Sequence, residues 1–337
     1  MPANPAPPSR EKVMNTNAGK TVNRRRVLFI GAALAGAALV PPAMAGSALP
    51  VARWRGVALG ADAQLHLAGV SDAEARPVFA AVEQEIARLE SVFSLYRSGS
   101  AVSRLNATGM LDNPPPELLE LLATARSVWH ATGGLFDPTV QPLFRALAEH
   151  AAGGATPGLR IEDRLPDALA LVGFDKVSFD TRAVRLARPG MALTFNGIAQ
   201  GYLTDRVSEL LRGRGYSNIL VDLGEIRALG PGRHGGGWLV GLAGHGATAM
   251  PQPIAVTDRA VATSAMHGTT VDAKGTAGHI LHPLKGTAPA YREQVTVMDA
   301  SATRADALST AAVLMDDAAI ETLRRQGCDV IASPFTA

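Results

Sequence analysis

The sequence predicts a mixed fold of the α+β or α/β class, and two opposite patterns carry that prediction. Between Val78 and Phe93, apolar residues recur in steps of four, four, three and four, which is the spacing of one face of an α-helix. Residues 219–223, by contrast, form a short and almost uninterrupted apolar run, as a buried strand does. The chain has 337 residues, of which 47% are apolar, enough for one large domain or two packed halves.

The region from residue 46 to residue 134 is expected to contain strands followed by two helices. One or two strands are expected around residues 57–67. Asp72 belongs to a residue type that caps helix N-termini, so the first helix is expected to start there and to end at Phe93. Pro116 suits the first turn of a second helix, and Gly133-Gly134 can end it.

The rest of the chain continues the mixture of strands and helices without an internal repeat. A third helix is expected from about residue 198 to residue 211, and Gly213 can end it. The other expected elements are a loop at 151–160, the buried strand at 219–223, a glycine-rich hairpin at 230–252 with a strand at 238–242, a strand at 294–298 and a helix at 305–315.

Residues 1–45 have the order of a secretory leader. Three arginines at 24–26 precede an apolar run at 27–40, and Ala43-Met44-Ala45 then supplies the small residues of a cleavage site. The paired arginines are typical of a twin-arginine leader. The alternative is a membrane anchor, but a run of 14 residues is short of the ~20 that span a bilayer as a helix. We therefore expect a signal peptide at 1–45, one functional domain at 46–337, a periplasmic location and no stable membrane span after leader removal.

The charge of the chain without this leader excludes several functions. Residues 46–337 hold 26 Lys/Arg and 29 Asp/Glu, a formal charge of −3, and no basic stripe, so nucleic-acid binding is not expected. The single cysteine, Cys328, excludes an intrachain disulfide framework and a cysteine-based metal cluster. A phosphate ligand would need a metal ion or backbone N–H groups to balance its charge.

Two glycine-bearing segments are candidate ligand sites. In the turn at 133–139, glycines let the backbone approach a ligand, and Pro138 biases Asp137 toward extended geometry. The segment at 193–202 passes from an extended stretch into a helix N-terminus, whose free N–H groups suit a phosphate, and Gly197 allows close approach. A carbonyl in the loop before this helix can face a hard cation. The alternatives are an ordinary turn and a plain strand–helix connection.

Two polar pairs are candidates for chemistry. His279 and His282 are three residues apart and would face opposite sides of a strand, so a single histidine acting as general base fits better than a zinc pair. On a helix, Asp306 and Thr310 lie one above the other, and their oxygens suit Mg²⁺. The alternatives are a structural histidine, a helix cap at Asp306 and a hydroxyl of Thr310 that bonds a backbone carbonyl.

These segments, in this order, resemble the ApbE family of flavin transferases over nearly the whole chain from about residue 57. The resemblance rests on the following stretches: Phe93-Ser94-Leu95-Tyr96 with Ser103-Arg104-Leu105-Asn106, Gly134 to Thr139, Gly197 to Tyr202, Ala262-Thr263-Ser264, Gly278 to Pro283, and Asp306 to Thr310. It implies an α+β fold of mixed sheets and packed helices, with an active-site cleft between two halves.

The resemblance also implies a reaction and a set of site residues. The enzyme would be an FAD:protein FMN transferase that cleaves FAD and attaches FMN by a phosphoester bond to a Thr or Ser of an acceptor flavoprotein, with release of AMP. His279 would act as the base, and Mg²⁺ would be held by Gly197, Asp306 and Thr310. The FAD contacts implied by position are Tyr96, Leu135, Phe136, Asp137, Thr194, Gln200 and Ile280.

Several positions depart from the family pattern. Thr194 stands where the family usually has aspartate, Gln200 where it has lysine, His282 where it has aspartate and Leu284 where it has arginine, and Leu223-Gly224-Glu225 is one residue shorter than the usual glycine–glycine–aspartate turn. These departures favour a subfamily that resembles the NosX-like factors of nitrous oxide respiration, with a NosR-like membrane flavoprotein as acceptor. The alternatives are a periplasmic FAD pyrophosphatase, in which water replaces the acceptor, and a non-catalytic FAD carrier.

Overall fold

The structure is a computed structural model that describes residues 49–152, 161–242, 253–268, 270–271, 278–286 and 291–334. The expected leader at 1–45, most of the expected loop at 151–160 and residues 243–252 of the expected hairpin at 230–252 lie outside the described residues. No helix among the described ranges is long and apolar enough to cross a bilayer.

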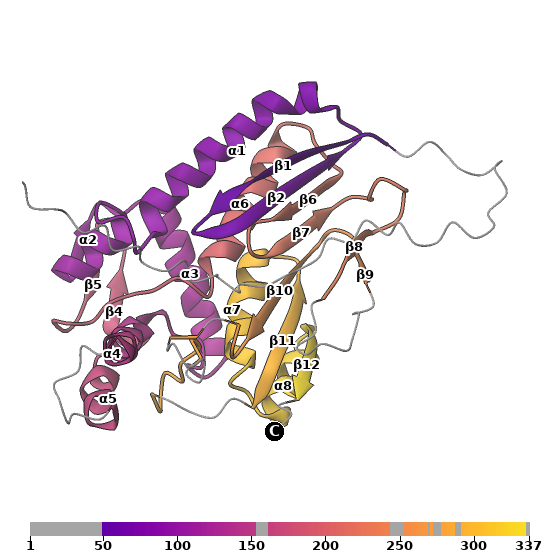
Figure 1. The fold of residues 1–337 in the computed structure, drawn as a ribbon. Coiled ribbons are helices and arrows are strands. Elements are labelled where there is room, and N and C mark those ends of the chain that lie inside the picture. Colours follow the sequence, from indigo (N-terminus) through magenta and orange to yellow (C-terminus); the bar gives the residue numbers. More distant parts are fainter. Residues whose placement is uncertain are drawn as a thin grey trace, which may run out of the picture.

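A seven-stranded sheet forms the centre of the molecule (Figure 1). In spatial order its strands are β1 (Val51–Ala58), β2 (Ala61–Ala68), β6 (Ile219–Asp222), β7 (Ile226–Leu229), β10 (Arg259–Ala265), β11 (Arg292–Asp299) and β12 (Asp329–Pro334). All neighbouring strands pair antiparallel. The strand signal expected around residues 57–67 is the β1–β2 hairpin at one edge, and the last strand of the chain forms the other edge.

Two smaller sheets and several helices complete the fold. The small sheets are β3 (Met110–Asp112), β5 (Ala183–Leu186) and β4 (Val177–Phe179), and β8 (Trp238–Val240) with β9 (Ile254–Val256). The α-helices are α1 (Asp72–Phe93), α2 (Ala101–Thr108), α3 (Pro116–Ala131), α4 (Gln141–Ala151), α5 (Ile161–Ala170), α6 (Ala199–Gly213), α7 (Ala302–Ala312) and α8 (Asp317–Arg325). Short 3₁₀ helices are η1 (Pro138–Val140) and η2 (Phe174–Lys176). This mixture confirms the α+β prediction.

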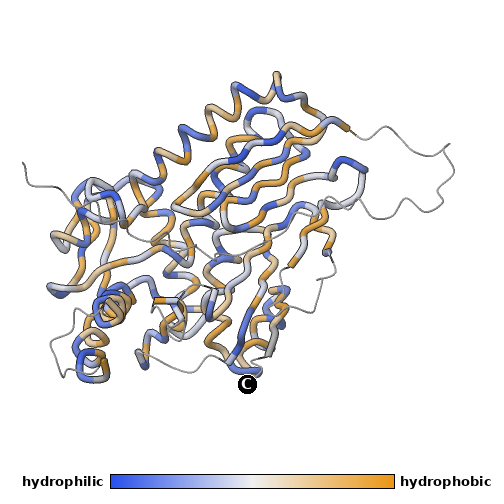
Figure 2. Tube along the Cα trace, viewed as in Figure 1, coloured by the Kyte–Doolittle hydropathy of each residue, from blue (hydrophilic) through white to orange (hydrophobic). Residues whose placement is uncertain are grey.

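The central sheet is buried on both faces because its strands alternate their side chains. In β6, Ile219 and Val221 belong to the large core shared with the helices, whereas Leu220 belongs to a second core under the β8–β9 hairpin. In Figure 2 the middle strands are mostly orange, while blue residues recur along α1. The helix face predicted from Val78 to Phe93 is the buried face of α1.

The N-terminal cap of α1 and the start of α7 differ from the sequence prediction, and α7 also ends at Ala312 instead of residue 315. The cap of α1 is Ser71 and not Asp72, because Ser71 has the extended backbone of a cap and its hydroxyl accepts the Glu74 N–H. The last predicted helix at 305–315 begins three residues earlier, because Ser301 caps it by accepting the Arg304 N–H. The helices α2, α4, α5 and α8 were not predicted.

Candidate functional site

The N-terminal end of α6 packs closely against α7, and glycine makes this possible at two points. A Cβ on Gly197, two residues before α6, would lie 2.8 Å from the Thr310 hydroxyl oxygen. A Cβ on Gly201 would lie 2.3 Å from the carbonyl oxygen of Ala302 and 2.9 Å from Asp306 Cβ. Real Cβ contacts are not this short, so any larger residue would separate the helices. The structure thus brings together Gly197, Asp306 and Thr310, which the sequence predicts as metal ligands.

The Asp306 carboxylate is buried at this contact and oriented by the backbone of α6. The side chain is 1% exposed, and its Oδ2 accepts the N–H of Gly201 at 3.0 Å. Asp306 lies inside α7, which Ser301 caps, so the alternative interpretation of Asp306 as the helix cap is wrong. Through the Gly201 N–H, the carboxylate instead contacts the first turn of α6.

The Thr310 hydroxyl has a neighbour that the sequence prediction did not include. Ser264 Oγ, on β10, lies 3.4 Å from Thr310 Oγ1 and 2.8 Å from Ser309 Oγ. Ser264 is 1% exposed and Thr310 is half-buried. Ser264 belongs to one of the stretches on which the family resemblance rests, and that resemblance was the sequence signal for this residue. No local pattern links Ser264 to Ser309 of α7, which follows it by 45 residues.

The loop that carries His279 runs along the end of the same strand. Gly278 packs so closely on β10 that a Cβ there would lie 2.3 Å from the Met266 carbonyl oxygen, two residues after Ser264. His279 is half-buried, and Ile280 is buried. Within the described residues, the stretch that carries His279 and His282 is not a regular strand: Gly278 and His282 form isolated bridges with Thr270 and Gly286.

The side chain of His282 is part of a local turn. Its side chain is buried, and its Nδ1 accepts the Leu284 N–H at 3.2 Å inside a turn closed by Gly286. Burial lowers the pKa of His282, and the nearby positive charge of Lys285 lowers it further. The imidazole is thus held neutral as part of the turn.

Asp137 serves the fold through its carboxylate. Oδ1 accepts the Thr139 N–H at 2.7 Å and the Thr139 hydroxyl at 2.5 Å, while Oδ2 accepts from Phe174 N at 3.0 Å and Trp129 Nε1 at 3.1 Å. Burial raises the pKa of Asp137, and these hydrogen bonds oppose the rise. Both carboxylate oxygens of Asp137 are thus occupied by hydrogen bonds within the protein.

The segment around Asp137 is adjacent to the one that carries Thr194. The Thr194 N–H donates to the Pro138 carbonyl at 2.8 Å. Asn106 of α2 brackets Leu193, donating to its carbonyl at 2.8 Å and accepting its N–H at 2.7 Å. Phe136 is buried and Leu135 is half-buried in the large core. Two predicted FAD-contacting segments thus lie side by side.

Tyr96 and Gln200 lie in different surroundings. Tyr96, in the loop between α1 and α2, is 89% exposed, so its ring is accessible to a ligand. Gln200, in the first turn of α6, rests on Gly224: its Nε2 is 2.5 Å from the place that a Gly224 Cβ would occupy. The uncharged amide therefore packs on the β6–β7 turn, which Gly224 forms with φ +102°.

A cavity of about 360 Å³ adjoins the residues expected at the flavin end. It lies between the α1–α2 loop, α2 and the start of α4, and is lined by Leu95, Ser103, Asn106, Ala107, Gln141 and Arg145. Leu95 precedes Tyr96, and Asn106 holds the residue before Thr194. None of the predicted site residues lines the cavity itself.

Among the described residues there is no group of three or more His, Cys, Asp or Glu side chains that could hold a metal ion. The predicted ligand set contains one such side chain, Asp306, beside a hydroxyl and a backbone carbonyl. The two observations are compatible, because a cation that takes water and phosphate oxygens needs few protein carboxylates.

Comparison with known proteins gives a consistent result. The sequence model of the ApbE family matches residues 59–332. An FAD:protein FMN transferase of Treponema pallidum is 30% identical over 271 residues, covering 72% of this chain and 73% of that protein. The apo crystal structure of the Pseudomonas stutzeri flavinyl transferase ApbE is 27% identical, with a TM-score of 0.74 over 86% of this chain and 92% of that one. The Vibrio cholerae flavin transferase ApbE, 22% identical with a TM-score of 0.75 over 86% and 94%, shares the fold.

Proposed function

Since the chain belongs to the ApbE family, we propose that it transfers the FMN half of FAD onto an acceptor flavoprotein. The family match extends over nearly all the described residues and is the observation that carries this proposal. The relatives found along that length are FAD:protein FMN transferases. We further propose that the reaction depends on Mg²⁺, that the target is a Thr or Ser side chain and that AMP is released.

The oxygen set at the α6–α7 contact fits Mg²⁺. Asp306 offers a carboxylate, Thr310 a hydroxyl and Gly197 a backbone carbonyl, and Mg²⁺ prefers oxygen ligands. The close approach of Gly197 to Thr310 leaves no side chain between these groups. When bound, the ion supplies positive charge that offsets the negative phosphate oxygens of FAD. The positive end of the α6 dipole lies near the same place and also favours a negative ligand.

The proposed reaction is a displacement at the phosphorus on the riboflavin side of FAD. The acceptor hydroxyl oxygen forms a new P–O bond while the P–O bond to the adenosine phosphate breaks, and AMP leaves. His279 takes the proton of the attacking hydroxyl, because imidazole is the side chain that titrates near neutral pH. Alignment and charge neutralisation are the main needs of phosphoryl transfer, so one base, one cation and a helix terminus suffice.

FAD binding is proposed along the line of segments that the fold brings together. Tyr96 would cover the isoalloxazine ring, and Leu135, Phe136 and Asp137 would contact it through side chain or backbone. Thr194, Gln200 and Ile280 would contact the dinucleotide nearer α6. The exposure of Tyr96 and the hydrogen bond between Thr194 and Pro138 support this placement.

A flavinylation assay tests the proposed function. The protein, FAD, Mg²⁺ and a candidate acceptor flavoprotein are expected to give an acceptor band whose flavin fluorescence survives a denaturing gel, and mass spectrometry is expected to find FMN on a Thr or Ser. His279→Asn is expected to abolish the band while FAD binding persists. The matched control is His234→Asn, at an exposed residue between β7 and β8 that is not among the proposed site residues.

The same assay separates the alternatives. An FAD pyrophosphatase would release FMN and AMP at a useful turnover with no acceptor present. A non-catalytic FAD carrier would keep its biological role in His279→Asn. Absence of labelled acceptor with every flavoprotein tried, despite tight FAD binding, would contradict the transferase.

Export and the acceptor class are part of the proposal. The twin-arginine leader at 1–45 supports a periplasmic site of action, with the cleaved protein free of a membrane span. Cell fractionation of the native protein and of an Arg25→Lys, Arg26→Lys variant tests this, because loss of the arginine pair is expected to leave the protein in the cytoplasm. The NosX-like subfamily and a NosR-like acceptor stay predictions, which labelling of co-expressed membrane flavoproteins tests.

A further inference from the structure

The contact between α6 and α7 continues one helical turn beyond the proposed ligands. Gly201, opposite Asp306, follows Gly197 by four residues, and four residues further along α6 stands Asp205. Its partner is the first residue of α7, Ala302, which precedes Asp306 by four. A turn of α-helix holds ~3.6 residues, so these contacts form one stripe between helices that run in opposite directions.

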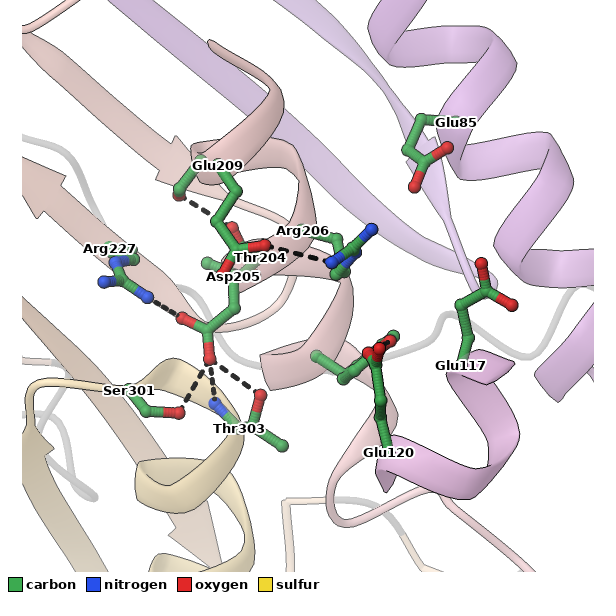
Figure 3. A network of polar contacts seen from close by, with 12 residues as sticks. Glu85, Glu117, Glu120, Thr204, Asp205, Arg206, Glu209, Arg227, Ser301 and Thr303 are labelled. Atoms are coloured by element: carbon green, nitrogen blue, oxygen red, sulfur yellow. Dashed lines mark hydrogen bonds and ion pairs between the residues drawn. The ribbon is translucent and has the colours of Figure 1, made fainter. Parts of the chain in front are cut away.

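The Asp205 carboxylate accepts four hydrogen bonds from the start of α7. Figure 3 shows those from Ser301 and Thr303. The donors are the Ser301 hydroxyl at 2.7 Å, the Ala302 N–H at 2.9 Å, the Thr303 N–H at 2.9 Å and the Thr303 hydroxyl at 2.7 Å. Ser301 itself caps the Arg304 N–H. The first N–H groups of α7, which have no acceptor within their own helix, thus donate to a side chain of α6.

The charge on Asp205 is compensated on both sides. The residue is 7% exposed, and its carboxylate forms an ion pair with Arg227 of β7. The positive end of the α7 dipole lies at the Ala302 and Thr303 N–H groups and also favours the carboxylate. Asp205 therefore joins α6, α7 and the central sheet at a single buried point.

We infer that Asp205 is a positioning residue that fixes the register of α7 against α6, and so holds Asp306 opposite Gly201 and Thr310 opposite Gly197. Asp306 and Thr310 follow the anchored residue Ala302 by one and two helical turns on the same stripe of α7. A shift at the anchor is transmitted along the helix to both oxygen ligands, because packed helices move as rigid units. This inference rests on the proposed function of the site.

Direct measurement of metal binding tests the inference. Mn²⁺ binding is followed by its electron paramagnetic resonance signal on the full chain, with FAD in excess and no acceptor. Asp205→Asn keeps the size of the side chain but replaces one acceptor by an N–H₂ donor that faces other donors. We expect Mn²⁺ affinity to fall about 10- to 100-fold, as when other partners that orient metal ligands are lost. Flavin transfer is expected to regain most of its kcat when Mg²⁺ is raised.

The matched control is Val207→Ala, which creates a cavity at a buried residue of the same helix whose side chain cannot form a hydrogen bond. It is expected to lower the melting temperature as Asp205→Asn does while leaving Mn²⁺ affinity within about twofold of the unmodified protein. Unchanged Mn²⁺ affinity in Asp205→Asn, or an equal loss in Val207→Ala, would overturn the inference.

Two further variants keep the outcome clear. Asp306→Asn is expected to abolish Mn²⁺ binding, and unchanged Mn²⁺ binding in this variant would refute the proposed metal site. If Mn²⁺ affinity is lost in Asp306→Asn but unchanged in Asp205→Asn, only the role of Asp205 is refuted. If Asp205→Asn yields no folded protein, the double variant Ser301→Ala, Thr303→Val removes two of the four donors. Its Mn²⁺ affinity is then expected to fall measurably, and an unchanged value would overturn the inference.

Discussion

The N–H of Gly201 donates to the Asp306 carboxylate at 3.0 Å, across a helix contact that has no room for a methyl group at Gly201. Gly201→Ala is therefore expected to push α6 and α7 apart and to destabilise the protein by about 1–3 kcal/mol, the usual cost of overpacking. Flavin transfer is expected to fall with it. Urea unfolding and the gel assay measure the two effects.

Gly213, at the end of the same helix, is the control for this change. A Cβ there meets no atom within 4 Å, so Gly213→Ala is expected to leave stability unchanged or to raise it by about 0.4–1 kcal/mol. Equal effects of the two substitutions would show that the helix contact is not the cause.

Asp306→Asn is expected to reduce Mg²⁺-dependent flavin transfer far more than it reduces stability. The amide oxygen can still accept the Gly201 N–H, so the unfolding free energy should fall by less than about 2 kcal/mol. The activity should fall more than about 100-fold, since even groups that only orient metal ligands contribute about 10- to 100-fold. Asp316→Asn, which changes the cap of α8, is the matched control. A comparable loss of stability and activity would argue that Asp306 is structural.

Asp137→Ala is expected to destabilise the fold by about 3 kcal/mol or more. The change leaves donors of Thr139, Phe174 and Trp129 without their acceptor, and a buried unsatisfied donor costs about 1–3 kcal/mol. Asp180→Ala removes a carboxylate that also accepts backbone N–H groups, from Arg182 and Ala183, but at the surface, so its cost should stay below about 1 kcal/mol. A small effect at Asp137 would instead favour a direct role of its carboxylate in binding.

His66 is expected to make the protein less stable in mild acid. Burial and the charges of Arg53 and Arg55 lower its pKa from 6.5 to about 4 in the folded protein. Between these two values the unfolded chain binds the proton more tightly, so stability falls as the pH drops from about 6.5 toward about 4. Urea unfolding at several pH values should show a smaller loss in His66→Gln.

The control for the pH effect is His130→Gln, at an exposed histidine. It should retain the acid sensitivity of the unmodified protein. If His66→Gln and the unmodified protein lost stability in parallel, the acid sensitivity would have to come from other groups.

Which features could be predicted from the sequence depends on whether a local pattern of residues encodes them. Apolar periodicity located α1 because one face of this helix is buried and the other is exposed to solvent. The same signal placed α7 three residues late, because that helix is buried on nearly every side, from Ala302 to Ala312, and has little contrast. Ser71 was missed as a cap because Asp72 beside it is an equally good residue type for that role.

The site could be predicted in part for a related reason. Asp306 and Thr310 are one turn apart in the chain, so their proximity is a local property of any helix. Ser264 and Asp205 lie 46 and 97 residues from their respective partners Thr310 and Ala302, and no local pattern encodes such pairs. The packing of Gln200 on Gly224 likewise depends on how the β6–β7 turn meets α6.

The distance in sequence between α6 and α7 bears on how the protein reaches its active form. Gly201 and Asp306 are separated by 105 residues, and a loop of that length must close before the two helices meet. Contacts of this kind slow folding, and they form only when the intervening strands have taken their places. The oxygen ligands therefore do not exist as a set in the newly made chain, unlike those of a cation-binding loop of a dozen residues. A cation at this place would stabilise the finished protein without templating its assembly.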